Sequence, residues 1–263
     1  MEMFSFLITE SGTVSPWVYP LLAACGLVAG ALNVLAGGGS FLTLPLLIFL
    51  GLPAGVANGT NRVGILMQNV SAVRRFQKDA VLDRRAALWS ALPATVGAGL
   101  GTWIALSTDD GDFKRILAFL MVAVTLISFW TPKTREPTDE APVELSRRAY
   151  GILAAGFFVV GLYGGFVQAG VGFLILAATS FAGLDLVRGN AVKVLSVLCF
   201  TALSLTIFTL GGKVHWPFGL ALAAGTFVGG HIGARLTVLK GHAWVKRLVT
   251  VAIVVFAVRL WTA

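Results

Sequence analysis

The stretch NVLAGGGSFLTLP, residues 33–45, decides how this chain is built. Three consecutive glycines and a proline disfavour a helix, yet the flanking residues have the length and apolarity of membrane-spanning helices. Within a bilayer, irregular backbone is tolerated only where other protein groups or a water-filled cavity satisfy its N–H and C=O groups. The stretch therefore predicts a functional break in a membrane protein.

The composition indicates a polytopic helical membrane protein. Hydrophobic residues make up 57% of the 263-residue chain and charged residues 12%, about half of the roughly 25% usual in soluble domains. Apolar runs at 17–36, 87–106 and 244–261 approach the length of about 20 residues that a helix needs to cross a bilayer. The net charge of +8 would also suit a nucleic-acid partner, but the basic residues lie in short loops between apolar runs. Membrane topology accounts for them, so no nucleic-acid partner is expected.

An internal duplication is predicted from matches at a constant offset of 132 residues. Residues that match at this offset include Phe41 and Phe173, Asn58 and Asn190, Gly97 and Gly229, and Lys114 and Lys246. We therefore expect a first membrane repeat at 1–130, a charged cytoplasmic linker at 131–149 and a second membrane repeat at 150–263.

The charges predict that the two repeats cross the membrane in opposite directions. Lys and Arg gather in cytoplasmic loops, which puts 74–85 and 131–148 inside and the N-terminus and the acidic segment 107–112 outside. Continuing along the chain puts 211–216 outside, 239–247 inside and the C-terminus outside. Inverted repeats of this kind are typical of secondary transporters, which bind their substrate near the bilayer midplane.

Each repeat is expected to contain five membrane segments, one of them too short to cross upright. The expected segments are 17–36, 40–50, 54–76, 86–106 and 113–130, then 150–168, 172–182, 186–208, 217–238 and 245–262. The two short segments are interpreted as parts of Gly-rich broken or re-entrant helix pairs, and whether they cross or form hairpins with the segments that follow stays open. The predicted fold class is an all-α polytopic membrane protein with two inverted-topology repeats.

Residues at the breaks are candidates for binding an anion. A helix that begins at Ser40 or Gly172 would direct free N–H groups and a partial positive charge at the membrane midplane. Polar residues of the third segment, 58–69, are costly if they face lipid and usually face a cavity or each other. Arg62 and Lys193 hold nearly equivalent positions, so each repeat would contribute one cation, unless both snorkel to an interface.

The candidate substrate-binding residues are Asn33, Gly38, Gly39, Ser40, Asn58, Thr60, Asn61, Arg62, Gln168, Gly170, Gly172, Asn190 and Lys193. The paired glycines are interpreted differently, as small residues for close helix packing; these are Gly26, Gly30, Gly97 and Gly101.

The acidic residues are mostly outside the predicted segments, and Asp185 alone comes near one. Buried carboxylates typical of cation sites and proton relays are therefore missing. No spacing of His, Cys or Ser suggests a metal, a cofactor or a catalytic triad, so an enzyme is not expected. Buried cations without acids favour an anionic substrate. Each exported negative charge gains about 2.3 kcal/mol per 100 mV of membrane potential, so export needs no coupling residue, whereas import does.

The glycine-rich break, the run FLTLPLLIFLGLP (41–53), the motif ANGTNR (57–62) and the later GNAVKV (189–194) resemble the sulfite exporter TauE/SafE family. The resemblance covers nearly the whole chain. It implies transport of sulfite, organosulfonates or sulfoacetate, usually outward, in the bacterial cytoplasmic (inner) membrane. An importer or an anion channel of the same fold is the alternative, and a homo-oligomer is left open. Gln168 and Asp185 depart from the family pattern, and Gln168 is interpreted as a donor to an oxyanion.

Overall fold

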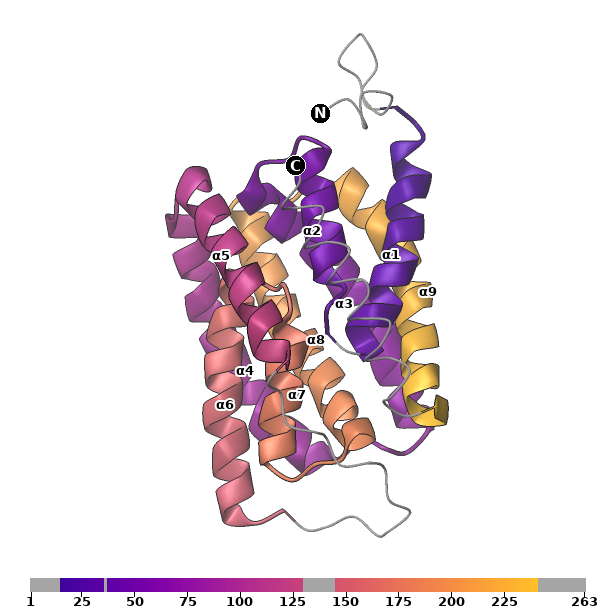
Figure 1. The fold of residues 1–263 in the computed structure, drawn as a ribbon, viewed down its shortest axis with the longest axis vertical. Helices are drawn as coiled ribbons and strands as arrows, with labels where there is room; N and C mark the ends of the chain where they lie inside the picture. Colours follow the sequence, from indigo (N-terminus) through magenta and orange to yellow (C-terminus); the bar gives the residue numbers. More distant parts are fainter. Residues whose placement is uncertain (1–14, 36, 130–144, 241–263) are drawn as a thin grey trace.

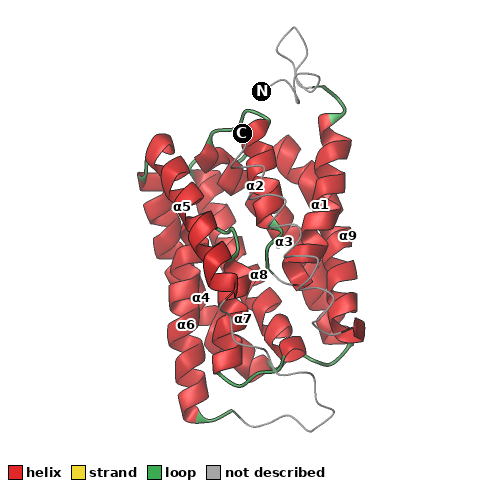
Figure 2. Cartoon of the chain, in the orientation of Figure 1, coloured by secondary structure: helices red, strands yellow, loops and turns green. Residues whose placement is uncertain are grey.

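The computed structural model describes residues 15–35, 37–129 and 145–240. These residues form helices and short connections, with no strand among them (Figure 2). The helices are α1 (Val18–Leu35), α2 (Ser40–Phe49), α3 (Ala54–Lys78), α4 (Arg84–Ser107), α5 (Asp110–Phe129), α6 (Arg147–Phe166), α7 (Val171–Phe181), α8 (Leu186–Leu210) and α9 (Trp216–Lys240) (Figure 1). They match the expected segments to within three residues at either end. The segment expected at 245–262 and most of the linker expected at 131–149 lie outside the described residues.

Successive helices, with the short α2 and α7 included, run along the molecule in alternating directions (Figure 1). The α2–α3, α4–α5 and α8–α9 connections lie at the upper end of Figure 1, and the α3–α4 and α7–α8 connections at the lower end. The short helix α2 runs back toward the end where α1 begins, and the short helix α7 toward the end where α6 begins.

Four helices of the described part are long and apolar enough to cross a membrane: α1, α6, α8 and α9. Helix α3 is as long as α8, at 25 residues, but its polar residues lower its apolarity, and those between Asn58 and Asn69 are buried within the protein. Helices α4 and α5 present large apolar side chains on the outside, such as Trp103 at 67% exposure and Phe119 at 70%. An exterior of this kind suits contact with lipid tails.

Helix α1 packs along α9, and α6 packs along α4. Helices α3 and α8 lie between these two pairs. Close approach depends on the paired glycines, as predicted. A Cβ on Gly26 or Gly30 would meet the backbone of α9, and one on Gly97 or Gly101 would meet the backbone of α6. Small residues at these positions let the helix backbones touch.

The chain breaks its helical path twice, between α1 and α2 and between α6 and α7. Gly37 has φ +94° and Gly170 has φ +71°, in the left-handed region that favours glycine. The two breaks lie against each other, because a Cβ on Gly37 would meet the backbone of Gly172 and a Cβ on Gly172 would meet Gly37. Helix α7 begins at Val171 rather than at the expected Gly172, since Gly170 makes the turn and serves as its N-cap.

The first turns of α3 and α8 are capped in different ways. Asp185 precedes α8, and its carboxylate accepts two backbone hydrogen bonds of 2.9 Å from the first turn. The equivalent residue before α3 is Pro53, which has no such group. There the carboxylate of Asp110, at the start of α5, accepts from the N–H groups of Ala54 at 3.2 Å and Gly55 at 2.9 Å. Asp185, which departs from the family pattern, therefore caps α8 from the adjacent position, whereas α3 is capped by Asp110, a residue distant in the sequence.

Candidate functional site

Arg62 on α3 is fully buried and binds the carbonyl end of α6. Its Nη2 donates to the carbonyl oxygens of Gly164 at 3.1 Å and Gly165 at 2.6 Å, and its Nη1 donates to Oε1 of Gln168 at 3.2 Å. Its guanidinium carbon lies 4.7 Å from the ring centroid of Phe208, a cation–π contact. Carbonyl groups at a helix C-terminus lack helical partners and attract positive charge. Most of this guanidinium is thus committed to holding the end of α6, although its Nε has no partner.

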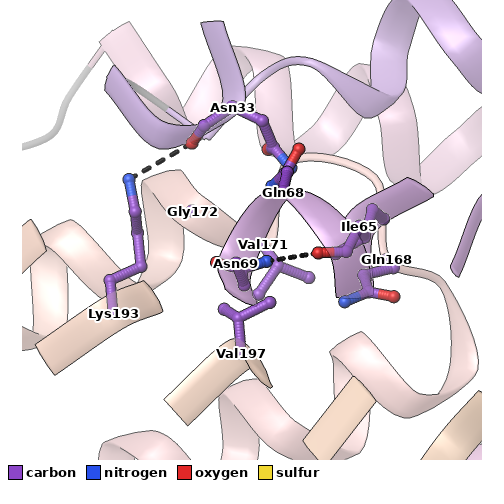
Figure 3. A pocket seen from close by; sticks show the side chains of 9 residues that line it. All are labelled: Asn33, Ile65, Gln68, Asn69, Gln168, Val171, Gly172, Lys193 and Val197. Carbon is purple, nitrogen blue, oxygen red and sulfur yellow. Dashed lines mark hydrogen bonds between the residues drawn. The ribbon is translucent and has the colours of Figure 1, made fainter. Parts of the chain in front are cut away.

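Lys193 on α8 likewise binds the carbonyl end of α1. Its Nζ donates to the carbonyl oxygens of Asn33 at 3.3 Å and Val34 at 2.7 Å (Figure 3). The side chain is 2% exposed, and that of Arg62 0%. The alternative that these two cations snorkel to an interface is therefore wrong. Each cation binds the carbonyl end of the helix that precedes a break, and that helix belongs to the other half of the chain.

Further side chains complete the end of α6. Nδ2 of Asn58 donates to the carbonyl oxygen of Phe166 at 2.9 Å, and Oγ1 of Thr102 donates to that of Gly165 at 3.1 Å. The counterpart of Asn58 at the second break is Asn190. It is fully buried, and neither atom of its amide group has a hydrogen-bond partner among the described residues.

A small cavity lies beside Lys193, among α1, α3, α7, α8 and the α6–α7 connection (Figure 3). Its lining residues are Asn33, Ile65, Gln68, Asn69, Gln168, Val171, Gly172, Lys193 and Val197. Its volume is about 10 Å³, about the room that one water molecule needs. It adjoins the first turn of α7, where the N–H groups of Val171 and Gly172 precede the first backbone hydrogen bond of the helix, that of Phe173 to Gly170. An ammonium group, a helix N-terminus and several amide groups at one cavity suit a small anion.

Four of the thirteen predicted residues line this cavity, namely Asn33, Gln168, Gly172 and Lys193. The other nine do not line it; they are Gly38, Gly39, Ser40, Asn58, Thr60, Asn61, Arg62, Gly170 and Asn190. All nine are buried. The structure thus brings together Asn33 at the end of α1 and three of the five second-half candidates, and it places the other first-half candidates away from the cavity.

The first-half candidates bind neighbouring elements. Oγ1 of Thr60 accepts from the N–H of His215 at 2.9 Å, and Oδ1 of Asn61 accepts from Oγ1 of Thr43 at 2.7 Å. Oγ of Ser40 and Nδ2 of Asn61 are buried without a partner. Gly39 packs against the backbone of α1, and Gly38 and Gly170 each pack against a phenylalanine ring of the opposite break.

Gln168 links the cavity to Arg62. Its Oε1 accepts from Arg62, and its Nε2 donates to Oγ1 of Thr201. One hydrogen of the Gln168 amide group remains, so the interpretation of this residue as a donor to an oxyanion stays a prediction.

Sequence reasoning omitted Gln68 and Asn69 from the candidates, although both belong to the polar segment of α3. Asn69 donates through Nδ2 to the carbonyl oxygen of Ile65 at 2.7 Å, which fixes its amide group at the cavity wall. The available signal was the polarity of Gln68 and Asn69, because polar residues within a membrane segment usually face a cavity or each other. No group of His, Cys, Asp and Glu that could hold a metal ion occurs in the described ranges.

Comparison with known proteins supplies the family. A family model described as "Sulfite exporter TauE/SafE" matches residues 22–260. A "Probable membrane transporter protein" of Haemophilus influenzae is 30% identical over 233 residues, 88% of this chain and 89% of that protein. The "Probable membrane transporter protein YfcA" of Escherichia coli K12 is 28% identical over 264 residues, 99% of this chain and 94% of that protein. No solved structure matches. The chain therefore belongs to the sulfite exporter TauE/SafE family of membrane transporters.

Proposed function

We propose that this transporter exports a small sulfur-containing anion, such as sulfite, an organosulfonate or sulfoacetate, across the bacterial inner membrane. The observation that carries the proposal is the cavity beside Lys193. The ammonium group of Lys193 is buried, and the described residues provide no ion-pair partner for it. Because an unpaired buried charge is costly, an anion in this cavity would supply the missing negative charge. The name of the matched family supports a sulfur oxyanion.

Reciprocal contacts support two inverted repeats around this site. At the offset of 132 residues, α1 corresponds to α6 and α4 corresponds to α9, so the α1–α9 and α6–α4 pairs are equivalent. Phe41 and Phe173 are also equivalent, and their rings stack against each other at a centroid distance of 6.4 Å. Residues that contact their own equivalents are expected beside a two-fold axis. Such an axis would pass through the region where the two breaks meet, which is where inverted-repeat transporters bind substrate.

The distribution of charge supports the orientation. The α3–α4 connection and its flanks, at the lower end of Figure 1, contain five Lys and Arg residues between positions 74 and 85. The α4–α5 connection, at the upper end, contains Asp109, and α5 begins at Asp110. Under the positive-inside rule the lower end faces the cytoplasm. The membrane potential then favours anion movement from the lower end to the upper end, which is export.

The small volume of the cavity favours a carrier over a channel. A space for about one water molecule is too small for a sulfite ion. The helices around the cavity must therefore separate to admit the anion and close again. Rocking of one repeat against the other provides that movement in transporters built from inverted repeats.

Transport by the purified protein in proteoliposomes tests the proposal. We expect saturable flux of at least one of labelled sulfite, sulfoacetate and methanesulfonate, and loss of that flux in Lys193→Ala. Lys213→Ala, on the exposed α8–α9 connection, is the matched control and should transport normally. Arg62→Ala should lose flux together with thermal stability, because Arg62 holds the end of α6. Normal flux in Lys193→Ala would refute the site, and a conductance that does not saturate would favour a channel.

A further inference from the structure

We propose that Lys193 takes up and releases a proton in each transport cycle, so that one proton crosses the membrane with each anion. This inference rests on the proposed function and adds a second transported species, the proton, to the same site. One proton offsets one negative charge, so the membrane potential still favours export of a dianion such as sulfite, whereas a monoanion that moves with one proton transfers no net charge. In the loaded form the side chain is an ammonium paired with the anion. In the return form it is a neutral amine, after the anion and one proton have left on the same side.

The hydrogen bonds of Nζ are compatible with both forms. Two positions around Nζ are occupied by the carbonyl oxygens of Asn33 and Val34. An ammonium has three hydrogens, whereas a neutral amine keeps two hydrogens and a lone pair. Both carbonyl groups therefore keep their donors when the proton leaves, and only the third position changes. Since Lys193 lines the cavity, that third position is where an oxygen of the anion would bind.

In the described part of the chain, no carboxylate lines the cavity to fix the protonation state of Lys193. Of the nine described residues that line the cavity, Lys193 alone has a titratable side chain. Helices α1 and α7, which pack on this part of α8, contain no Asp, Glu, Lys, Arg or His. On α8 itself, Asp185 caps the first turn and pairs with Arg188 at 3.4 Å.

The remaining helices that contact α8 bring cations but no carboxylate toward this cavity. Their charged and titratable residues in the described part are Arg62, Arg74, Arg75 and Lys78 on α3, Arg84 and Arg85 on α4, Arg147, Arg148, Tyr150 and Tyr163 on α6, and His231, Arg235 and Lys240 on α9. The nearby carboxylates are engaged elsewhere, Asp79 with Arg75 at 2.9 Å and Asp83 as the cap of α4. A buried ammonium without a counter-charge is costly, so anion binding and protonation of Lys193 favour each other by reciprocal linkage.

The nearly equivalent cation of the first half has the opposite character. Arg62 cannot be deprotonated in a protein, and both of its Nη groups are bound to acceptors at the end of α6. The two cations therefore divide two roles, a permanent charge that holds a helix end and a titratable charge beside the cavity.

Proton movement is measured with methanesulfonate, a permanent monoanion that itself transfers no proton. Proteoliposomes contain a pH-sensitive dye, and valinomycin with equal potassium on both sides holds the potential at zero. We expect one proton per methanesulfonate, and a gradient of one pH unit should support about tenfold accumulation of the anion. Lys193→Arg keeps the charge but releases no proton. Accumulation driven by the pH gradient should therefore fall from about tenfold to about one. Lys213→Arg is the matched control and should behave as the unmodified protein.

The outcomes separate this inference from the proposed function. Flux without proton movement, or accumulation that ignores the pH gradient, would overturn the role of Lys193 and leave the transporter intact. Absence of flux for sulfite, sulfoacetate and methanesulfonate alike would overturn the proposed function itself. If Lys193→Arg fails to fold, the proton-to-anion ratio of the unmodified protein decides, because a ratio of zero excludes coupling.

Discussion

Replacing Gly37 by alanine is expected to destabilise the protein through two separable effects. Its φ of +94° lies in the left-handed region, where an L-residue costs about 1–2 kcal/mol. Its Cβ would also meet the backbone of Gly172 and push the two breaks apart, and overpacking of this kind costs about 1–3 kcal/mol. Together these effects lower the free energy of unfolding by about 2–5 kcal/mol.

Two other glycines isolate each effect. Gly51 has φ +91° and nothing within 4 Å of an added Cβ, so its replacement by alanine should cost only the about 1–2 kcal/mol of backbone strain. Gly172 has no positive φ but faces Gly37, so its replacement should cost the about 1–3 kcal/mol of overpacking. Denaturant unfolding of the three variants in detergent micelles gives the comparison. If Gly37→Ala proves no more destabilising than Gly51→Ala, the close contact between the breaks is wrong.

Three further changes are read by thermal unfolding in micelles. Asp110→Ala removes the cap of α3 and should cost about 0.5–2 kcal/mol; an unchanged melting temperature would contradict that role. Thr43→Val leaves the buried Oδ1 of Asn61 without its donor and should lower the free energy of unfolding by about 1–3 kcal/mol. Thr43→Ser keeps the hydroxyl donor and should retain most of that stability. Gly101→Ala meets the backbone of α6 and should cost about 1–3 kcal/mol. Gly99→Ala, whose Cβ makes an ordinary contact at 3.4 Å, should stay within about 0.5 kcal/mol; equal losses would argue against the close packing of α4 on α6.

The helix bounds could be predicted because the signals that set them are local. Apolar runs set the lengths, and glycine and proline mark the ends, so the break before Ser40 and the short helix after it follow from residues 33–45. The shift of α7 to Val171 is of the same local kind, since it depends on which glycine takes the left-handed turn.

The partners of the buried polar residues could not be predicted, because they come from distant parts of the chain. Arg62 and Lys193 were both expected to bind an anion, and their burial was foreseen as one of two alternatives. Their acceptors are carbonyl groups 102 and 160 residues away, and a carbonyl group leaves no signature in the sequence. The polarity of Gln68 and Asn69 was visible in the sequence, but most of the other residues of their cavity come from distant helices.

Each of the two buried cations binds the end of a helix in the other half of the chain, and this has a consequence for biosynthesis. The carbonyl groups that end α1 receive their donor from a residue 160 positions later. At a synthesis rate of about 5–20 residues per second, they stay without it for about 10–30 s after they are made. The first half on its own is therefore an incomplete folding unit within the membrane, because the end of α1 lacks its hydrogen-bond donor until α8 has been made. If the chain is divided between the halves, each fragment should become resistant to proteolysis only when the other is produced in the same cell.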